Sequence, residues 1–256
     1  MMRIGAKMES PIFEIFDGLP RQGPGSNECT ERAFNMLSSL PAGTKILDIG
    51  CGVGMQTIHL ASICKDCHVT ATDIYQPFLD KLMENAAKEG LDDRITTVCA
   101  SMDDLPFEAE EFDVIWAEGS IFILGFEKGI SYWKQFLKSG GCMAVTENTW
   151  FTDEPSPEAV EFWQEIYPGI MNIPDTEKVI KETGYDVIEH FKLPVSVWYE
   201  FYANLEKRVD EISDNYKGNT EAEMILEFNR REIKLFRERP DEYGYAFYIF
   251  QKNANK

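Results

Sequence analysis

The sequence is poor in histidine, in basic residues and in long apolar runs. It has three histidines among 256 residues, and 25 Lys and Arg against 44 Asp and Glu, a formal net charge of −19. Such a surface repels phosphate backbones and anionic lipid headgroups, which argues against nucleic acid or a membrane surface as the partner. No apolar run approaches the roughly 18–20 residues of a membrane-spanning helix, and the first twenty residues lack the apolar core and cleavage site of a signal peptide. We therefore expect a cytoplasmic protein without membrane insertion.

Cysteine is also sparse. The six cysteines, at 29, 51, 64, 67, 99 and 142, are too scattered for a disulfide framework at this length and fit a reducing cytoplasm. The stretch CKDCH, residues 64–68, matches the attachment signature of c-type haem, but it falls between an expected helix and an expected strand. We therefore expect Cys64, Cys67 and His68 to cap and pack. A zinc site needs about four ligands and only three side chains cluster here, so we expect no metal.

Apolar strands alternate with amphipathic helices from about residue 27 onward. Strand patterns lie at 44–50, 68–74, 95–100, 111–119 and 142–150, and helix patterns at 27–40, 55–64, 77–90 and 129–141. Asn27 is the expected N-cap of the first helix. The last of these helices is expected to end at the glycine pair 140–141. This alternation predicts an α/β fold with a doubly wound, mostly parallel sheet.

The regular alternation breaks after residue 150. The stretch from 151 to 175 is rich in proline and aromatic residues and is expected to be a helical insertion. A helix at 176–184 and a strand at 185–193 follow. Two long helices are expected near 195–216 and 220–238, before a closing strand at 243–252. The strands at 185–193 and 243–252, together with the five earlier strands, give seven strands.

Alternating glycines follow the first expected strand, in the stretch ILDIGCGVGMQT at 46–57. Such a loop presents backbone N–H groups and a helix N-terminus to an anionic group of a ligand. Dinucleotide-binding folds space their glycines G-x-G-x-x-G, whereas Gly50, Gly52 and Gly54 have the spacing G-x-G-x-G. An acid, Asp48, precedes the first glycine by two residues. The spacing disfavours an NAD-dependent oxidoreductase, although that class shares the fold.

The ends of the next three strands carry polar residues. Asp73 ends the second strand, where a carboxylate can accept both hydroxyls of a ribose. After the third strand, Asp103 can accept from an adenine amino group while Met102 packs on the ring. Glu118 and Gly119 end the fourth strand. Because all these segments converge on one edge of the sheet, they predict a nucleoside site there.

Taken together, these residues resemble the class I S-adenosylmethionine-dependent methyltransferases. The stretches LDIGCGVGMQT, ATDIYQPFL, ASMDDLPFEAEEFDVIWAEGSIFIL and YWKQFLKSGGCMAVTE are similar to that family's successive motifs, in order and spacing, over about residues 40–150. The likeness is greatest to the small-molecule branch that includes the ubiquinone and menaquinone biosynthesis methyltransferases. It implies a Rossmann-like, seven-stranded methyltransferase fold. It also implies methyl transfer from S-adenosylmethionine to an oxygen, nitrogen or carbon of a small-molecule substrate, with S-adenosylhomocysteine as product.

The resemblance further implies site residues and boundaries. Gly50, Cys51, Gly52 and Gly54 would hold the methionine part, Asp73 and Ile74 the ribose, and Met102 and Asp103 the adenine, with Glu118 beside the sulfonium. The predicted cofactor-binding residues are Asp48, Gly50, Cys51, Gly52, Gly54, Gln56, Thr57, Asp73, Ile74, Gln76, Ser101, Met102, Asp103, Glu118 and Gly119. Residues 1–26 are expected to fold over the cofactor site. Residues 27–256 would form the methyltransferase domain, with helical insertions near 151–175 and 195–240.

Methyl transfer depends mainly on positioning and on stabilising charge, so a general base is optional. None of the histidines falls at the expected site, and the candidate catalytic residues are Glu118, Glu147 and Trp150, which lie at strand ends. The Asp/Asn-Pro-Pro-aromatic motif of methyltransferases that act on DNA amino groups is replaced by AEGS. The alternative is a non-catalytic module that binds S-adenosylmethionine as a sensor or scaffold. A homodimer is possible, since dimers are common among soluble enzymes.

Overall fold

Eight strands form one sheet in the computed structural model, which describes residues 11–37 and 40–253. The strand order is β3-β2-β1-β4-β5-β8-β7, and the two-residue strand β6 pairs with β5. Neighbours among β1 to β5 are parallel, whereas β8 runs antiparallel between β5 and β7. The predicted α/β fold is therefore confirmed: its main path has seven strands, and β6 is additional.

The strands are β1 (Lys45–Ile49), β2 (His68–Asp73), β3 (Ile95–Cys99), β4 (Phe112–Ala117), β5 (Leu137–Trp150), β6 (Met171–Asn172), β7 (Tyr185–Lys192) and β8 (Tyr243–Lys252). The α-helices are α1 (Pro11–Asp17), α2 (Asn27–Phe34), α3 (Met55–Ile63), α4 (Gln76–Glu89), α5 (Phe126–Trp133), α6 (Pro157–Ile166), α7 (Ile173–Glu182), α8 (Val195–Ser213) and α9 (Thr220–Glu238).

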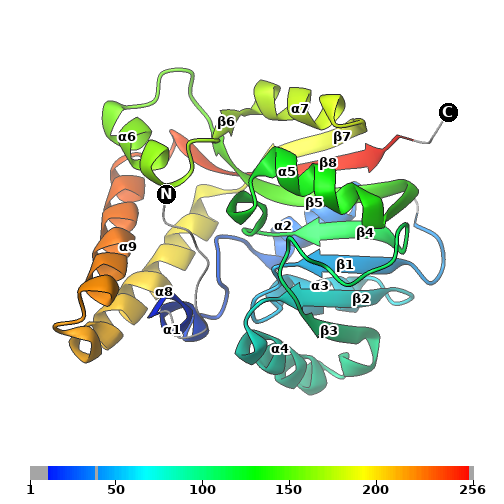
Figure 1. The fold of residues 1–256 in the computed structure, drawn as a ribbon, viewed down its shortest axis with the longest axis horizontal. Coiled ribbons are helices and arrows are strands. Elements are labelled where there is room, and N and C mark those ends of the chain that lie inside the picture. The colour runs from blue at the N-terminus through cyan, green and yellow to red at the C-terminus, as the bar shows by residue number, and fades with distance from the viewer. Residues whose placement is uncertain (1–10, 38–39, 254–256) are drawn as a thin grey trace.

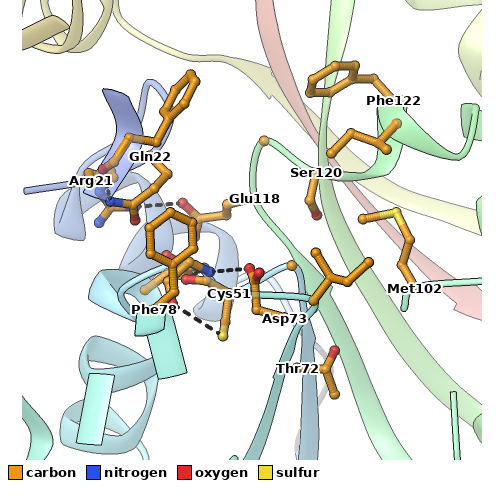
Figure 2. A pocket seen from close by; sticks show the side chains of 18 of the residues that line it. Arg21, Gln22, Cys51, Thr72, Asp73, Phe78, Met102, Glu118, Ser120 and Phe122 are labelled. Atoms are coloured by element: carbon orange, nitrogen blue, oxygen red, sulfur yellow. Dashed lines mark hydrogen bonds and ion pairs between the residues drawn. The ribbon is translucent and has the colours of Figure 1, made fainter. Parts of the chain in front are cut away.

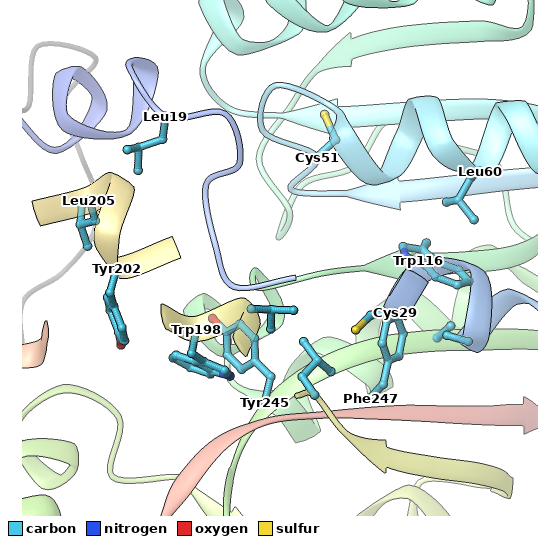
Figure 3. Close-up of a cluster of buried hydrophobic side chains, with 14 of the residues drawn as sticks. Leu19, Cys29, Cys51, Leu60, Trp116, Trp198, Tyr202, Leu205, Tyr245 and Phe247 are labelled. Atoms are coloured by element: carbon cyan, nitrogen blue, oxygen red, sulfur yellow. The ribbon is translucent and has the colours of Figure 1, made fainter. Parts of the chain in front are cut away.

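Helices cover both faces of the sheet because its strands carry apolar side chains on both sides. On one face, α2, α3 and α4 pack in a core with Ile46 and Val69, and on the other, α5 and α7 pack with Leu47 and Ile115. The helices α1, α6, α8 and α9 lie together beside the sheet (Figure 1). Their buried residues join the first core, in which Trp198 of α8 lies against Tyr245 of β8 (Figure 3).

Two predicted helices, 27–40 and 129–141, have limits that differ from the structure, and the first ends at Phe34. Helix α2 has Ser26 as its N-cap in place of Asn27, because the Ser26 hydroxyl accepts from Cys29 N at 3.2 Å while the Asn27 carboxamide accepts from Arg21. The helix expected at 129–141 begins earlier, as α5, and gives way to a 3-10 turn that ends at Phe136. The glycine pair lies inside β5, where the pairing with β4 shifts register.

Cys64 and Cys67 form a disulfide, whereas we expected packing thiols. Cys64 is nevertheless the C-cap of α3, and its N–H donates to Leu60 O. The His68 side chain hydrogen-bonds to Thr96 on the neighbouring strand, at 2.8 Å. The bridge therefore closes the turn between α3 and β2, away from the sheet edge where the predicted site lies.

Candidate functional site

A cavity lies at the carboxyl edge of the parallel strands, between the sheet and the N-terminal part of the chain (Figure 2). The structure brings these predicted cofactor-binding residues to its wall: Gly50, Cys51, Gly52, Gln56, Asp73, Ile74, Ser101, Met102, Glu118 and Gly119. The predicted residues that do not line it are Asp48, Gly54, Thr57, Gln76 and Asp103, together with Glu147 and Trp150. The cavity walls also include residues of α1 and of the connector, the name used below for residues 18–26.

The loop from β1 to α3 turns sharply under the cavity. Gly54 is the N-cap of α3 in the left-handed conformation, with φ +80°, and a Cβ there would collide with the Leu82 side chain of α4. At Gly52, with φ +55°, a Cβ would lie 2.5 Å from the Gln22 side-chain oxygen. The positive φ and the close neighbours at both positions favour glycine, which lets the loop turn sharply.

Asp48 lies behind this loop, at the end of β1. Its Oδ2 accepts from the Thr57 hydroxyl at 2.6 Å, while its Oδ1 is buried and has no partner among the described residues. Burial raises the pKa of Asp48 to about 7, although the bond from Thr57 opposes this. Gln56 donates to Cys51 O at 3.1 Å. Gln56 thus bonds the glycine loop directly, and Asp48 and Thr57 link the end of β1 to the start of α3 behind it.

Asp73, at the end of β2, supports the loop from the side. Its Oδ2 accepts from Gly52 N and its Oδ1 from Tyr75 N, both at 3.0 Å. Burial raises the pKa of this carboxyl group, and the bonds from backbone N–H groups oppose that shift. Because each carboxylate oxygen has two lone pairs, both oxygens can accept one further bond from the cavity side.

Apolar side chains form the outer wall next to Asp73. Ile74 is half exposed, at 50%, and both Ile74 and Met102 line the cavity. Phe13 of α1 stacks on Tyr75 with ring centroids 4.4 Å apart and meets Phe78 edge-on. Together these side chains make a flat, apolar slot that suits a planar ring.

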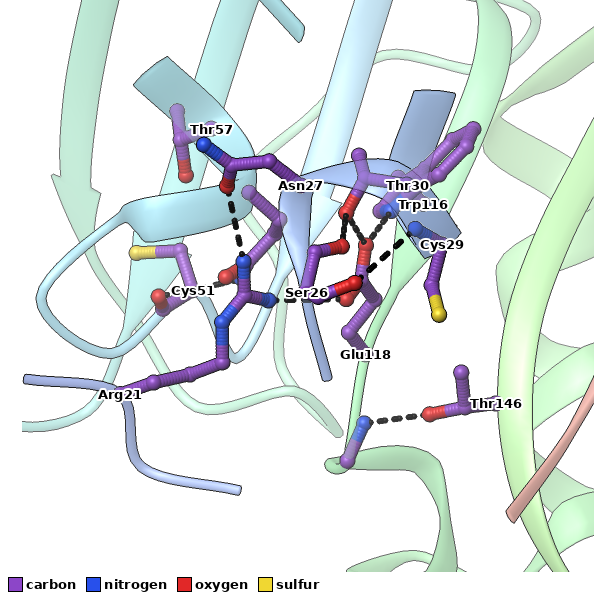
Figure 4. Close-up of polar contacts among 12 residues, drawn as sticks. Arg21, Ser26, Asn27, Cys29, Thr30, Cys51, Thr57, Trp116, Glu118 and Thr146 are labelled. Carbon is purple, nitrogen blue, oxygen red and sulfur yellow. Dashed lines mark hydrogen bonds and ion pairs between the residues drawn. The ribbon is translucent and has the colours of Figure 1, made fainter. Parts of the chain in front are cut away.

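Glu118, at the end of β4, is fully engaged (Figure 4). Its Oε2 accepts from Arg21 Nη1 at 3.0 Å, and its Oε1 accepts from the Thr30 hydroxyl at 2.7 Å and from Trp116 Nε1 at 2.9 Å. The Glu118 side chain is 5% exposed. With three donors around it, this carboxylate fastens the connector and α2 to the sheet.

Gln22 makes a second attachment between the connector and the site. Its side-chain oxygen accepts from Val53 N in the glycine loop at 2.9 Å. Its side-chain nitrogen donates to the carbonyls of Phe16 and Leu19, both at 3.1 Å. The end of α1 is therefore tied to the loop between β1 and α3.

The two other catalytic candidates lie away from the cavity wall. Glu147 on β5 is 1% exposed, and burial raises its pKa to about 8. Neither of its carboxyl oxygens has a hydrogen-bond partner among the described residues. Trp150, at the end of β5, meets Tyr243 edge-on, with ring centroids 6.1 Å apart.

Several lining residues were missed from the sequence. They come from the N-terminal part and from the segment after β4, and they are Phe13, Phe16, Arg21, Gln22, Phe122 and Ile123. The stretch RQGPGS, residues 21–26, has the glycine and proline content of a turn. Nothing in its spacing shows that Arg21 would reach Glu118, 97 residues away.

Within residues 11–37 and 40–253, no group of three or more His, Cys, Asp or Glu side chains is arranged to hold a metal ion. Over the same residues, no helix combines the length and the apolar character needed to cross a membrane. His59 lies in α3, 3.6 Å from a carboxylate oxygen of Glu31, and His190 lies 2.8 Å from Glu177. No histidine lines the cavity among the residues that the structure describes.

The sequence of the chain is similar to that of known methyltransferases. Residues 46–141 match the family model described as a methyltransferase domain. The chain is 33% identical over 133 residues to 27-O-demethylrifamycin SV methyltransferase of Amycolatopsis mediterranei, covering 52% of this chain and 47% of that protein. It is 30% identical over 117 residues to sarcosine/dimethylglycine N-methyltransferase of Aphanothece halophytica, covering 45% and 42%. The chain thus spans less than half the length of these curated relatives.

The fold has counterparts among solved structures. An S-adenosylmethionine-dependent methyltransferase from Geobacter sulfurreducens, in complex with S-adenosylhomocysteine, superposes with a TM-score of 0.79 at 18% identity. The match covers 95% of this chain and 98% of that chain, including the regions outside residues 46–141. The added helices therefore belong to an arrangement that a solved protein shares.

Proposed function

We propose that the chain is a class I S-adenosylmethionine-dependent methyltransferase, which transfers a methyl group from S-adenosylmethionine to a small-molecule acceptor. The observation that carries this proposal is the meeting of the glycine loop, Asp73 and Met102 in one cavity. S-adenosylmethionine supplies an electrophilic methyl carbon on a sulfonium, and S-adenosylhomocysteine is the product.

The chain's own residues fit this cofactor. Asp73 keeps a free lone pair on each oxygen for a ribose hydroxyl, and Ile74 and Met102 form the slot for the adenine ring. Gly50, Cys51 and Gly52 of the glycine loop line the cavity, where we place the methionine end of the cofactor. Asp48, whose buried Oδ1 has no partner among the described residues, lies behind the same loop and accepts from the Thr57 hydroxyl through Oδ2.

The geometry favours catalysis by positioning over catalysis by a general base. Glu118 is surrounded by three donors, so we assign it to holding the connector beside the sulfonium. Glu147 is buried, and it holds its proton at neutral pH because burial raises its pKa to about 8. Glu147 and Trp150 remain predictions as catalytic residues. An acceptor that attacks through its own lone pair needs no base.

The acceptor enters beside the cofactor and not within the same space. The cavity measures about 280 Å³, near the lower end of the roughly 300–1,000 Å³ of small-molecule sites. A nucleoside-sized cofactor would fill most of it. The relatives named above methylate an oxygen in one case and a nitrogen in the other, so the methylated atom stays open. The net charge of −19 supports a small molecule over nucleic acid, and we place the enzyme in the cytoplasm.

Calorimetric titration with S-adenosylmethionine and S-adenosylhomocysteine tests the proposal. Folded protein should bind both, and binding of neither would refute it. Methyl-labelled S-adenosylmethionine with a panel of amines, phenols, thiols and carboxylates then tests transfer. Binding without transfer to any panel member would favour the alternative, a cofactor-binding sensor or scaffold.

A further inference from the structure

Two polar side chains next to the cavity have no role in the site described so far. Asn148 on β5 and Tyr245 on β8 are register partners, so they share one face of the sheet. Asn148 is 3% exposed and Tyr245 is 6% exposed. In the described part of the chain, neither the Asn148 carboxamide nor the Tyr245 hydroxyl has a hydrogen-bond partner.

Gly119 links Tyr245 to the cavity wall. It lines the cavity, and a Cβ added to it would lie 3.5 Å from Tyr245 Oη. Its N–H donates at 2.7 Å to the hydroxyl of Thr146, which shares a face of β5 with Asn148 (Figure 4). Gly23 of the connector also lines the cavity and lies next to Gly119, since a Cβ on Gly23 would be 4.0 Å from Gly119 Cα. The Tyr245 hydroxyl therefore lies next to a glycine of the cavity wall.

We propose that Asn148 and Tyr245 form the polar part of the acceptor subsite and face the methyl group to be transferred. This inference rests on the proposed function. It fits the position of Gly119 next to Glu118, where the sulfonium is expected. Both side chains are uncharged, so they suit a neutral amine or hydroxyl: Asn148 Oδ1 accepts the N–H or O–H of the acceptor, and Tyr245 Oη donates to a second polar atom.

The surroundings of Tyr245 keep it in the donor form. Burial raises the pKa of its phenol well above the usual range. The Trp198 ring, with its centroid 4.8 Å away, fixes the orientation of the Tyr245 ring (Figure 3). Tyrosines that only build the core are satisfied by the protein itself: the Tyr248 hydroxyl pairs with Thr149 at 3.0 Å, and the Tyr185 hydroxyl donates to Ile130 O at 2.8 Å.

Tyr243 provides a matched control for this argument. It lies two residues from Tyr245 on the same face of β8, and its buried hydroxyl also lacks a partner among the described residues. Tyr243 pairs in register with Trp150, which lies two residues beyond Asn148 toward the end of β5, and it packs against Trp163. It shares the burial and the chemistry of Tyr245 without the contact to Gly119.

Sinefungin tests the inference without knowledge of the acceptor, because it carries an amine where S-adenosylmethionine carries the S-methyl group. Calorimetry should measure sinefungin and S-adenosylhomocysteine affinity for the wild type, Tyr245→Phe, Asn148→Ala and Tyr243→Phe. The sinefungin ammonium donates, so Asn148 Oδ1 and a lone pair of Tyr245 Oη would both accept from it. We expect Tyr245→Phe and Asn148→Ala each to weaken sinefungin about two- to tenfold, the loss of one hydrogen bond. S-adenosylhomocysteine affinity should be unchanged in both, and Tyr243→Phe should change neither.

The outcomes separate the two proposals. If the wild type binds neither ligand, the proposed function fails. If S-adenosylhomocysteine binds but the ratio of the two affinities is the same in Tyr245→Phe, Asn148→Ala and the wild type, only the acceptor subsite is refuted. An equal loss in Tyr243→Phe would refute it too, because that loss would reflect repacking of β8. Circular dichroism of each variant verifies folding.

Discussion

Replacing Asp73 with alanine is the sharpest probe of the cofactor site. The change removes two acceptors for the ribose hydroxyls, and bonds to a charged acceptor contribute roughly 1.5–3 kcal/mol each. It also frees the Gly52 N–H that Asp73 holds at 3.0 Å, which loosens the glycine loop. At 1.4 kcal/mol per decade, we expect S-adenosylhomocysteine to bind about a hundredfold more weakly, measured by isothermal titration calorimetry. Because burial raises the pKa of Asp73, losing its charge should leave the fold intact.

Two further variants complete this experiment. Asp73→Asn keeps one acceptor, but its amide nitrogen must face either Gly52 N or Tyr75 N, so we expect an intermediate affinity. Asp80→Ala removes an exposed carboxylate from α4 and controls for the change in net charge. Near-wild-type affinity in folded Asp73→Ala would show that the ribose lies elsewhere, and the site assignment would then be wrong.

The remaining predictions concern the connector and a buried acid. Gln22→Ala removes the acceptor of Val53 N and both bonds to the end of α1; S-adenosylhomocysteine affinity should fall about three- to tenfold, and calorimetry showing no change would contradict this. Glu118→Gln places an amide N–H against donors such as Arg21, which weakens the attachment of the connector. Trypsin should therefore cleave after Arg21 several-fold faster than in the wild type, and an equal rate would refute the anchoring role. Burial raises the pKa of Glu147 from 4.5 to about 8, so the folded chain retains a proton that the unfolded chain releases, and wild-type stability falls as pH rises from 4.5 to 8. Glu147→Gln has no carboxyl group to titrate, so its stability should not fall in this way. In urea unfolding, the free energy of unfolding of Glu147→Gln relative to that of the wild type should rise by a few kcal/mol from pH 4.5 to 8. Parallel pH profiles of the two proteins would rule this out.

The sequence was sufficient for the sheet and for the part of the site that the sheet builds. Strand and helix periods in residues 44–150 are local, and the turn chemistry of Gly54 and Gly90 marks helix limits directly. Because parallel strands bring their carboxyl ends to one edge, the convergence of Asp73, Met102 and Glu118 followed from topology alone. The predicted end of α5 was wrong because the pairing of β5 with β4 overrides the local helix propensity around residues 137–141.

The rest of the site depends on contacts that span the chain. Arg21 reaches Glu118 and Gln22 reaches Val53 because α1 packs against α8, and no local pattern encodes that packing. Tyr245 was likewise invisible, since an aromatic residue in a strand most often belongs to the core. The position of β8 between β5 and β7 decides which of its residues meet Gly119.

The packing of α1 on α8 also orders events during synthesis. The Glu14 carbonyl accepts from Arg208 Nη2, a contact between residues 194 positions apart. A ribosome that extends the chain by about 5–20 residues per second has released α1 well before α8 exists. The parallel strands β1 to β5 can pair in the meantime, but α1 has no final partner until the last helices emerge. The piece of the cofactor cavity that is translated first is therefore the last to take its place, and chains stalled before α8 would carry a formed glycine loop with no cover.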